Sequence, residues 1–254
     1  VRRSSLCDSL GGGIYPNRFM YPLFFWFCKN IGQAIPLIAL QYHEVKLNIK
    51  MNTYQIIIDI ANSLNMPIAP LEKQTKITNF SIWCDYIFLD TDERRRFAQL
   101  SHEYLIEQIQ TTNEMYLDYF DGKNRSKQFN IPLHFNHPIK DMYWIIYQQT
   151  IPIGRVANEC KIVLNNIDRF AFRKGNFFTE TQKFQFHSAY NVYNAHSYSF
   201  SLKPDEHQPS GTCNFSRINT AVLVLLLGAE IGYQPPLQGT YNVNVFVTNY
   251  NILR

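Results

Sequence analysis

The stretch TYNVNVFVTNY, residues 240–250, decides the fold class of this chain. Its side chains alternate with period two. One face carries Tyr241, Val243, Val245 and Val247, and the other carries Asn242, Asn244 and Phe246. Strict alternation over this length is typical of a β-strand with one buried face. The stretch therefore predicts a long, half-buried strand.

Three further segments also predict strands. The segments SYSFSLK (197–203) and HEVKLNIK (43–50) alternate, and AVLVLLLGA (221–229) is apolar throughout, which is typical of a strand buried on both faces. Turn signals such as Pro204-Asp205 separate such runs. The chain also holds 19 Phe, 16 Tyr and 3 Trp, residues that suit a pleated surface. Together these patterns predict an all-β fold.

One segment is typical of a helix instead. In DTDERRRFAQLSHEY (90–104), Asp90 can cap the helix, with Glu93 three positions later. The spacing also allows ion pairs from Asp90 to Arg94 and from Asp92 to Arg96, and it places Phe97, Leu100 and Tyr104 on one face. From Glu103 onward, EYLIEQIQ alternates. We therefore predict one short helix near residues 90–102, followed by a strand.

Charge and cysteine content limit the function classes. The net charge is +4, from 24 Lys and Arg against 20 Asp and Glu, which is too small a bias for a dedicated nucleic-acid binder. Only 17% of residues are charged, so we expect much of the surface to meet other protein. Five widely spaced cysteines without a CxxC motif predict reduced thiols.

The most apolar run near the start, FMYPLFFWFC (19–28), is too short to span a bilayer and contains Pro22. It also lacks a small-residue cleavage site of the kind that follows a signal peptide. We therefore predict no membrane-spanning segment.

Three motifs could carry chemistry but favour structure. His134 and His137 would point to opposite faces of a strand, and no second ligand pair follows at metal-binding spacing. Arg94, Arg95 and Arg96 fan around a helix, which favours a solvated or interface helix over a phosphate grip. The run Gly11-Gly12-Gly13 lacks the Lys-Ser/Thr of a phosphate-binding loop.

The densest polar stretch is KPDEHQPSGTCNFSR, residues 203–217. Catalysis there would require its reactive side chains to converge, namely Asp205, Glu206, His207 and Cys213. Pro204 and Pro209 stiffen the segment, and its short polar side chains can bond to local backbone. We therefore interpret it as an ordered loop, and we predict no catalytic residue, no metal ligand and no cofactor site.

A faint internal repeat links YPLFFWF (21–27) with IPLHFNH (131–137). A true repeat would mean two copies of one β domain in tandem, with a junction within residues 50–78. In so aromatic a chain, chance similarity is the alternative.

Five longer blocks carry a resemblance. They are WCDYIFLDTDERRRFAQLSHEYLIEQIQ (83–110), LHFNHPIKDMYW (133–144), NNIDRFAFRKGNFF (165–178), SFSLKPDEHQPSGTCNFSRI (199–218) and FVTNYNILR (246–254). In this order they resemble the major capsid proteins of large nucleocytoplasmic DNA viruses. The block PLFFWFCKNIGQAIPLIALQYHEVKLNI (22–49) is similar to the end of that family's first domain.

The resemblance implies an antiparallel double jelly roll. Residues 1–75 would hold the last strands of the first jelly roll and a linker, and residues 76–254 would form the complete second one. It also implies a structural protein rather than an enzyme: a homotrimer forming pseudo-hexagonal capsomers of an icosahedral virion, assembled in the host cytoplasm. Neighbouring capsomers and minor capsid proteins would be partners, without direct nucleic-acid contact, which leaves room for indirect contact with an inner viral membrane.

Family members are longer, so we expect this chain to be truncated relative to them at both ends. Two alternatives stay open. The chain could be a minor or paralogous jelly-roll component of a capsid, or a glycan- or nucleic-acid-binding module on the same fold.

Overall fold

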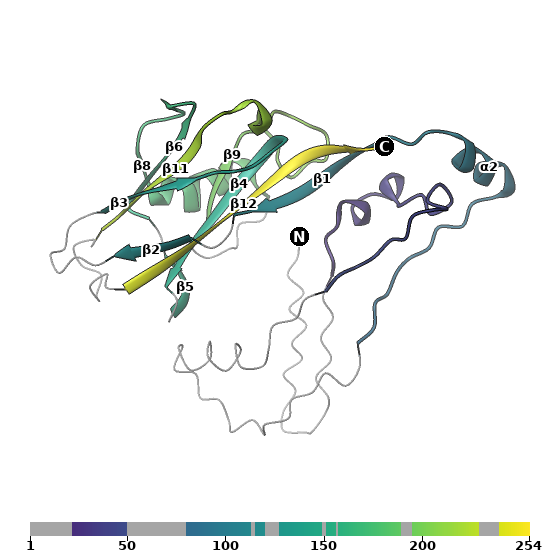
Figure 1. The fold of residues 1–254 in the computed structure, drawn as a ribbon, viewed down its shortest axis with the longest axis horizontal. Helices are drawn as coiled ribbons and strands as arrows, with labels where there is room; N and C mark the ends of the chain where they lie inside the picture. Colours follow the sequence, from purple (N-terminus) through teal and green to yellow (C-terminus); the bar gives the residue numbers. More distant parts are fainter. Residues whose placement is uncertain are drawn as a thin grey trace, which may run out of the picture.

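The computed structural model describes eight stretches of the chain, residues 22–49, 80–112, 115–119, 127–148, 151–155, 157–188, 195–228 and 239–254. Several sequence features lie outside these stretches: the Gly11–Gly13 run, Cys7 and the proposed junction. The described residues form two antiparallel sheets with the upstream segments beside them (Figure 1).

The first sheet, called sheet A, is organised around β12, the strand that the opening sequence stretch predicted. Its strands are β1 (Tyr104–Thr111), β2 (Met115–Tyr119), β4 (Pro138–Gln148), β5 (Ile151–Arg155), β9 (His196–Ser199), β10 (Cys213–Asn214) and β12 (Gly239–Leu253). β12 pairs with β1 and β2 along one edge and with β4 along the other. β4 in turn pairs with β5, β9 and β10.

The second sheet, called sheet B, is organised around β11. Its strands are β3 (Lys127–Pro132), β6 (Glu159–Leu164), β7 (Ile167–Asp168), β8 (Arg173–Lys174) and β11 (Ala221–Leu227). β11 lies between β3 and β6, and β6 carries β7 and β8 on its other side.

The order in which the chain visits the two sheets is that of a jelly roll. Sheet A runs β1/β2, β12, β4, then β9/β10, and sheet B runs β3, β11, β6, then β7/β8. First and last strands are thus neighbours in sheet A, and both sheets interleave early with late strands, as two nested Greek keys require. The predicted all-β jelly-roll sandwich is confirmed.

The core lies between the sheets and is strongly apolar. From sheet A, Val243, Val245 and Val247 of β12 are fully buried, as their alternation predicted. From sheet B, Leu223 and Leu225 of β11 are fully buried, and the neighbouring Val224 on the opposite face is buried too. This confirms that β11 is covered on both faces. Trp144 of β4 and Phe178 fill the space between, with ring centroids 5.2 Å apart.

The predicted helix is α2 (Thr91–Gln99), and Asp90 caps it by accepting a hydrogen bond from the backbone N–H of Glu93 at 2.9 Å. No residue of α2 is buried, and the helix stands apart from the two sheets (Figure 1). The expected ion pairs of Asp90 and Asp92 do not form: none of the ion pairs among the described residues joins them to Arg94 or Arg96. The Asp90 carboxylate bonds to the helix backbone instead.

A second helical segment was not predicted. A π-helix (Phe177–Thr181) continues into α3 (Gln182–Phe186) and lies between strands β8 and β9. It buries Phe178 against the core cluster and holds the Ser199 backbone N–H through the side chain of Gln182. This segment contacts β8 of sheet B and β9 of sheet A.

Two strand predictions need correction. The HEVKLNIK segment is extended but has no strand pairing over its described residues, 43–49, and Val45, Leu47 and Ile49 are exposed. In SYSFSLK, only the part up to Ser199 is a strand, because the backbone N–H groups of Phe200 and Ser201 both turn to the carbonyl of Lys140. Upstream, two short 3-10 helices form: η1 (Trp26–Cys28), at the end of the apolar run, and η2 (Ile31–Gln33), just after it. Within the described residues, no helix has both the length and the apolar character needed to span a bilayer.

Candidate functional site

The loop at residues 203–217 is tied down at both ends. The backbone N–H of Lys203 donates to Ser210 Oγ at 2.8 Å, and the hydroxyl of Ser216 accepts from the backbone N–H of His137 at 2.8 Å. Gly211 adopts a left-handed φ of 141°, and a Cβ there would lie 3.1 Å from the carbonyl oxygen of Phe200. The loop is therefore ordered by local hydrogen bonds, as the sequence predicted.

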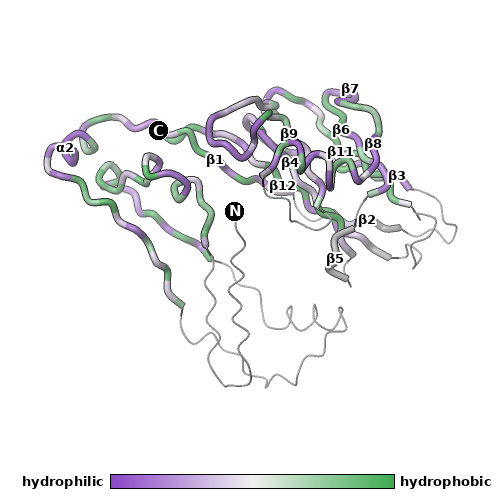
Figure 2. The backbone as a smooth tube through the Cα atoms, turned by 180° about the vertical axis from the view of Figure 1, so that it is seen from behind, coloured by the Kyte–Doolittle hydropathy of each residue, from purple (hydrophilic) through white to green (hydrophobic). Residues whose placement is uncertain are grey.

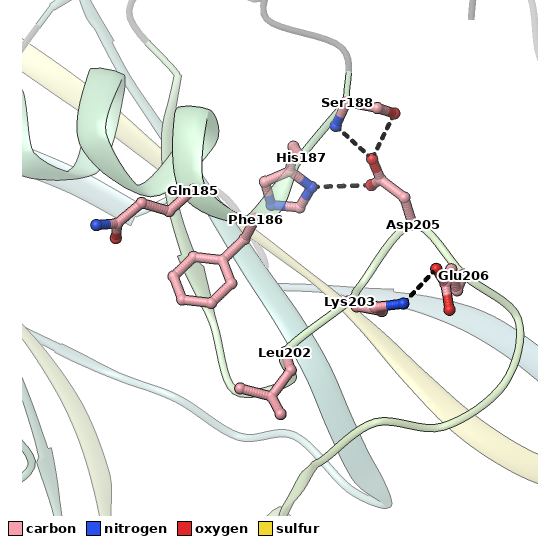
Figure 3. Close-up of a pocket in the computed structure, with 8 residues that line it drawn as sticks. All are labelled: Gln185, Phe186, His187, Ser188, Leu202, Lys203, Asp205 and Glu206. Carbon is pink, nitrogen blue, oxygen red and sulfur yellow. Dashed lines mark hydrogen bonds and ion pairs between the residues drawn. The ribbon is translucent and has the colours of Figure 1, made fainter.

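Asp205 of this loop is bonded to both His187 and Ser188 (Figure 3). Its carboxylate accepts from the backbone N–H of Ser188 at 2.6 Å and from the Ser188 hydroxyl at 2.7 Å, and it lies 3.0 Å from His187 Nδ1. Burial alone would raise the pKa of Asp205, but the bonds from Ser188 and His187 outweigh it and hold this pKa below its ordinary value. Asp205 therefore fastens the loop to the end of α3.

This arrangement borders an open hollow of about 280 Å³, and Figure 3 shows Phe186 and Leu202 on its apolar side. Ser188, His187 and Asp205 are the three residue types of a hydrolase triad. Their hydrogen bonds, however, do not run from serine to histidine to aspartate as in a triad. The Ser188 hydroxyl donates to the carboxylate, whereas a nucleophile needs to be activated by the imidazole. The hydroxyl of Tyr143 also lies close to the His187 ring, 3.1 Å from Nδ1 and 3.2 Å from Nε2. The residues that line this hollow therefore hold the 203–217 loop to the end of α3.

The four reactive side chains of the loop do not converge. Asp205 contacts His187, Glu206 pairs with Lys203 at 3.0 Å, and His207 lies near Gln33. Cys213 belongs to β10, where burial raises the pKa of its thiol. A nucleophilic cysteine needs the opposite shift, so this geometry does not serve thiol chemistry.

The two histidines of HFNH have separate roles. His134 is exposed between buried Leu133 and Phe135, which is the expected alternation. His137 has a positive φ of 67° and accepts the backbone N–H of Phe215 at its carbonyl oxygen, so it forms a turn into β4. In the stretches that the structure describes, no group of three or more His, Cys, Asp or Glu side chains is placed to hold a metal ion.

Exposed apolar side chains concentrate on the upstream segments. Tyr42 is 94% exposed and Trp83 90%, and Phe88 on the same extended segment as Trp83 is equally open. Figure 2 shows hydrophobic colour along both segments, outside the two sheets. So many exposed apolar side chains on neighbouring segments offer surface that another protein, a membrane or a ligand can cover. The three arginines of α2 are exposed beside this surface, and Arg94 donates through Nε to the carbonyl of Leu89.

A buried ionic group is the feature that sequence reasoning missed. Glu107 of β1 pairs with Lys140 of β4 at 2.8 Å, and both side chains are about 5% exposed or less. Lys29, from the upstream segment, reaches the other Glu107 oxygen at 2.5 Å. The available signal was charge inside each strand, one charged residue in YLIEQIQ and two in PIKDMYW. Sequence alone does not say that these charges meet.

Comparisons with known proteins agree with the architecture. Residues 93–254 match the family described as large eukaryotic DNA virus major capsid protein, and residues 14–90 match the family described as major capsid protein N-terminus. The chain is 39% identical to the major capsid protein of Pyramimonas orientalis virus, over 92% of this chain and 58% of that protein. It is 37% identical to the major capsid protein of Paramecium bursaria Chlorella virus 1, over 93% of this chain and 64% of that protein.

Solved structures of viral capsid proteins also match this chain. The PBCV-1 VP54 structure, fitted into a reconstruction of the virophage Sputnik, matches with a TM-score of 0.58 and 35% identity, over 66% of this chain and 52% of that one. The quasi-atomic model of the PBCV-1 capsid matches with a TM-score of 0.55. The chain thus spans about three fifths of the length of the curated relatives it matches. By the match over residues 93–254 and the jelly-roll order of the same residues, the chain belongs to the family of major capsid proteins of large eukaryotic DNA viruses.

Proposed function

We propose that this chain is a building block of an icosahedral viral shell, acting through shape and surface rather than through a reaction. The observation that carries the proposal is that the residues matching the capsid family, 93–254, contain all the strands of the jelly-roll sandwich. Antiparallel ladders around one apolar core make a rigid block, while loops and upstream segments offer contact surface. Shell building needs both properties.

The assembly unit that we propose is a homotrimer that forms a pseudo-hexagonal capsomer. A threefold ring requires heterologous contacts, in which one flank of the molecule fits a different flank of its neighbour. The exposed apolar side chains of the upstream segments and the charged helix α2 are different surfaces outside the sandwich, which supports such a contact. Neighbouring capsomers and minor capsid proteins would then be the partners of the trimer.

We further propose that residues 1–75 belong to a first jelly roll and its linker, and residues 76–254 to the second. Two observations support a chain of two parts. The two family matches meet between residues 90 and 93, downstream of the proposed boundary, and β1, the first strand of the sandwich, begins at Tyr104. Virion location with assembly in the host cytoplasm fits the four described cysteines, which are unpaired, as expected in a reducing compartment.

The test uses the protein with whatever residues its gene encodes on either side of this sequence. Multi-angle light scattering should give the mass of three chains, and negative-stain images should show six-lobed particles. A stable monomer at micromolar concentration would reject the proposal. Copy number per virion, measured by mass spectrometry, separates the main shell protein from a minor capsid component.

A further inference from the structure

The outer face of sheet A holds a buried carboxylate, that of Glu107 in β1. A carboxylate on an outer face is buried only if another part of the chain covers it. Glu107 lies directly opposite Tyr250 in the register of β1 and β12, and Tyr250 is on the opposite face of its strand from the core residue Val247. Ile109, on the same outer face of β1, is 73% exposed, but Glu107 is almost fully buried. Removing a carboxylate from water is costly unless it is paired and enclosed. Something outside the sandwich therefore covers Glu107.

The upstream segment supplies one half of this cover. Lys29 reaches Oε2 of Glu107, from 78 residues away in the sequence. Gln33, which is itself buried, donates its side-chain amide to the carbonyl of Leu105 at 3.4 Å, and the ring of Trp26 lies 6.2 Å from that of Tyr104. Three side chains of one short stretch thus contact the outer edge of β1.

The 203–217 loop supplies the other half. His207 Nε2 lies 2.7 Å from the side-chain nitrogen of Gln33, and His207 Nδ1 lies 3.6 Å from Oε1 of Glu107. Two residues earlier, Asp205 is fastened to His187 and Ser188. The loop therefore spans from the end of α3 to the place where the upstream segment meets β1.

The charges around Glu107 explain why a second lysine, Lys29, binds there. The sandwich itself supplies Lys140, which occupies one carboxylate oxygen of Glu107 and lies over the ring of Tyr250 at 5.5 Å. The second oxygen faces outward and is filled by Lys29, whose side chain is 46% exposed. The sandwich thus presents a pre-formed acceptor for one cation that arrives from outside. A hydrogen bond of this charged kind is about twice as strong as a neutral one.

We propose that Glu107 is the docking point of a latch that joins the upstream part of the chain to the sandwich. Lys29 enters the site, Gln33 aligns the segment along β1, and the 203–210 part of the loop closes over both through His207. The inference is independent of the shell role and concerns how this chain holds its two parts together.

Hydrogen exchange of the full chain, followed by mass spectrometry, tests the latch. The informative variant is Lys29→Met, because it removes the docking charge and leaves the Glu107–Lys140 pair of the sandwich intact. We expect exchange to rise roughly tenfold in residues 26–33 and in residues 203–210, the effect of losing one charge-assisted hydrogen bond. Peptides of β11 and β12 should exchange as in the wild type.

Two matched variants complete the design. Lys46→Met makes the same substitution in an exposed pair with Glu44 and should change neither segment. Lys29→Arg keeps the charge and should restore slow exchange. Equal exchange of residues 26–33 in Lys29→Met and Lys46→Met would overturn the docking role of Glu107. Faster exchange in residues 26–33 with an unchanged loop would overturn the closure by His207.

Discussion

The indole ring of Trp144 stacks on the imidazole ring of His196, with centroids 5.2 Å apart and an angle of 10° between the ring planes. The two residues face each other across the pairing of β4 and β9, and both are fully buried. His196 also accepts the backbone N–H of Ala157 at Nε2, at 3.1 Å. The stack and this hydrogen bond together join β4, β9 and the segment that holds Ala157 at the centre of the sandwich.

Truncating Trp144 should be among the most damaging changes in this chain. Trp144→Ala leaves a cavity beside Phe178 and His196, so the free energy of unfolding should fall by about 3–5 kcal/mol. Urea denaturation followed by circular dichroism measures this loss. Trp83→Ala removes the same side chain from an exposed position and should change stability by no more than about 0.5 kcal/mol. Similar losses for the two variants would contradict the burial of Trp144.

His196 should make stability depend on pH between 7 and 5. Burial lowers the pKa of His196 from 6.5 to about 3, so the folded protein keeps this ring neutral while the unfolded chain takes up a proton below pH 6.5. Stability is therefore complete above pH 6.5 and is lost as pH falls towards 3, by about 2 kcal/mol at pH 5.

The measurement is the free energy of unfolding at pH 7, 6 and 5. His196→Gln keeps an acceptor for Ala157 but does not titrate, so its profile over this range should be flatter than that of the wild type. His134→Gln, at an exposed position, should keep the wild-type slope. A slope that survives in His196→Gln would assign the effect to another group.

Local patterns predicted much of the sandwich because they report burial. Alternation identified β12, an unbroken apolar run identified β11, and the Asp90 cap placed the start of α2. The same signal failed for HEVKLNIK because an alternating segment becomes a strand only with a neighbour to pair with, which is a non-local condition.

The missed features share one cause. The helical segment 177–186 begins as a π-helix, so its phenylalanines do not follow the usual helical spacing. The Glu107–Lys140 pair joins residues of two strands that are not neighbours in sheet A, since β12 lies between them. In the 203–217 loop, the sequence predicted an ordered segment held by local hydrogen bonds, but the partners of Asp205 and His207 depend on tertiary contacts.

Gly211 should tolerate alanine poorly. Its φ of 141° is strained for any residue with a Cβ, and that atom would sit 3.1 Å from a backbone oxygen that cannot move freely. We expect Gly211→Ala to cost about 1–2 kcal/mol in thermal or urea unfolding. Gly32→Ala is the control, because its Cβ would meet nothing closer than 3.7 Å. Equal stability of Gly211→Ala and Gly32→Ala would contradict the left-handed conformation of Gly211.

The cysteines should react in a definite order. Cys28 and Cys84 are exposed, whereas Cys160 is fully buried and burial raises the pKa of its thiol far above the ordinary value. Because the thiolate is the reactive form, iodoacetamide at pH 8 should label Cys28 and Cys84 first, then Cys213, with Cys160 labelled only on unfolding. Peptide mapping by mass spectrometry gives the order. Early labelling of Cys160 in the native protein would contradict its place in the core.

Reversing the charge of α2 should weaken assembly more than folding. Arg94, Arg95 and Arg96 are exposed, and no residue of the helix is buried, so the triple substitution to Glu should lower the free energy of unfolding by no more than about 1 kcal/mol, mainly through the helix dipole. If α2 lies in a contact between chains or domains, as proposed, the same change places negative charge where a cation is recognised, and trimer formation should fall at least severalfold. Sedimentation velocity compares it with a triple Lys variant, which keeps the charge and should assemble like the wild type. Normal trimers from the Glu variant would remove α2 from the assembly contact and leave the exposed apolar segments as the surface to test next.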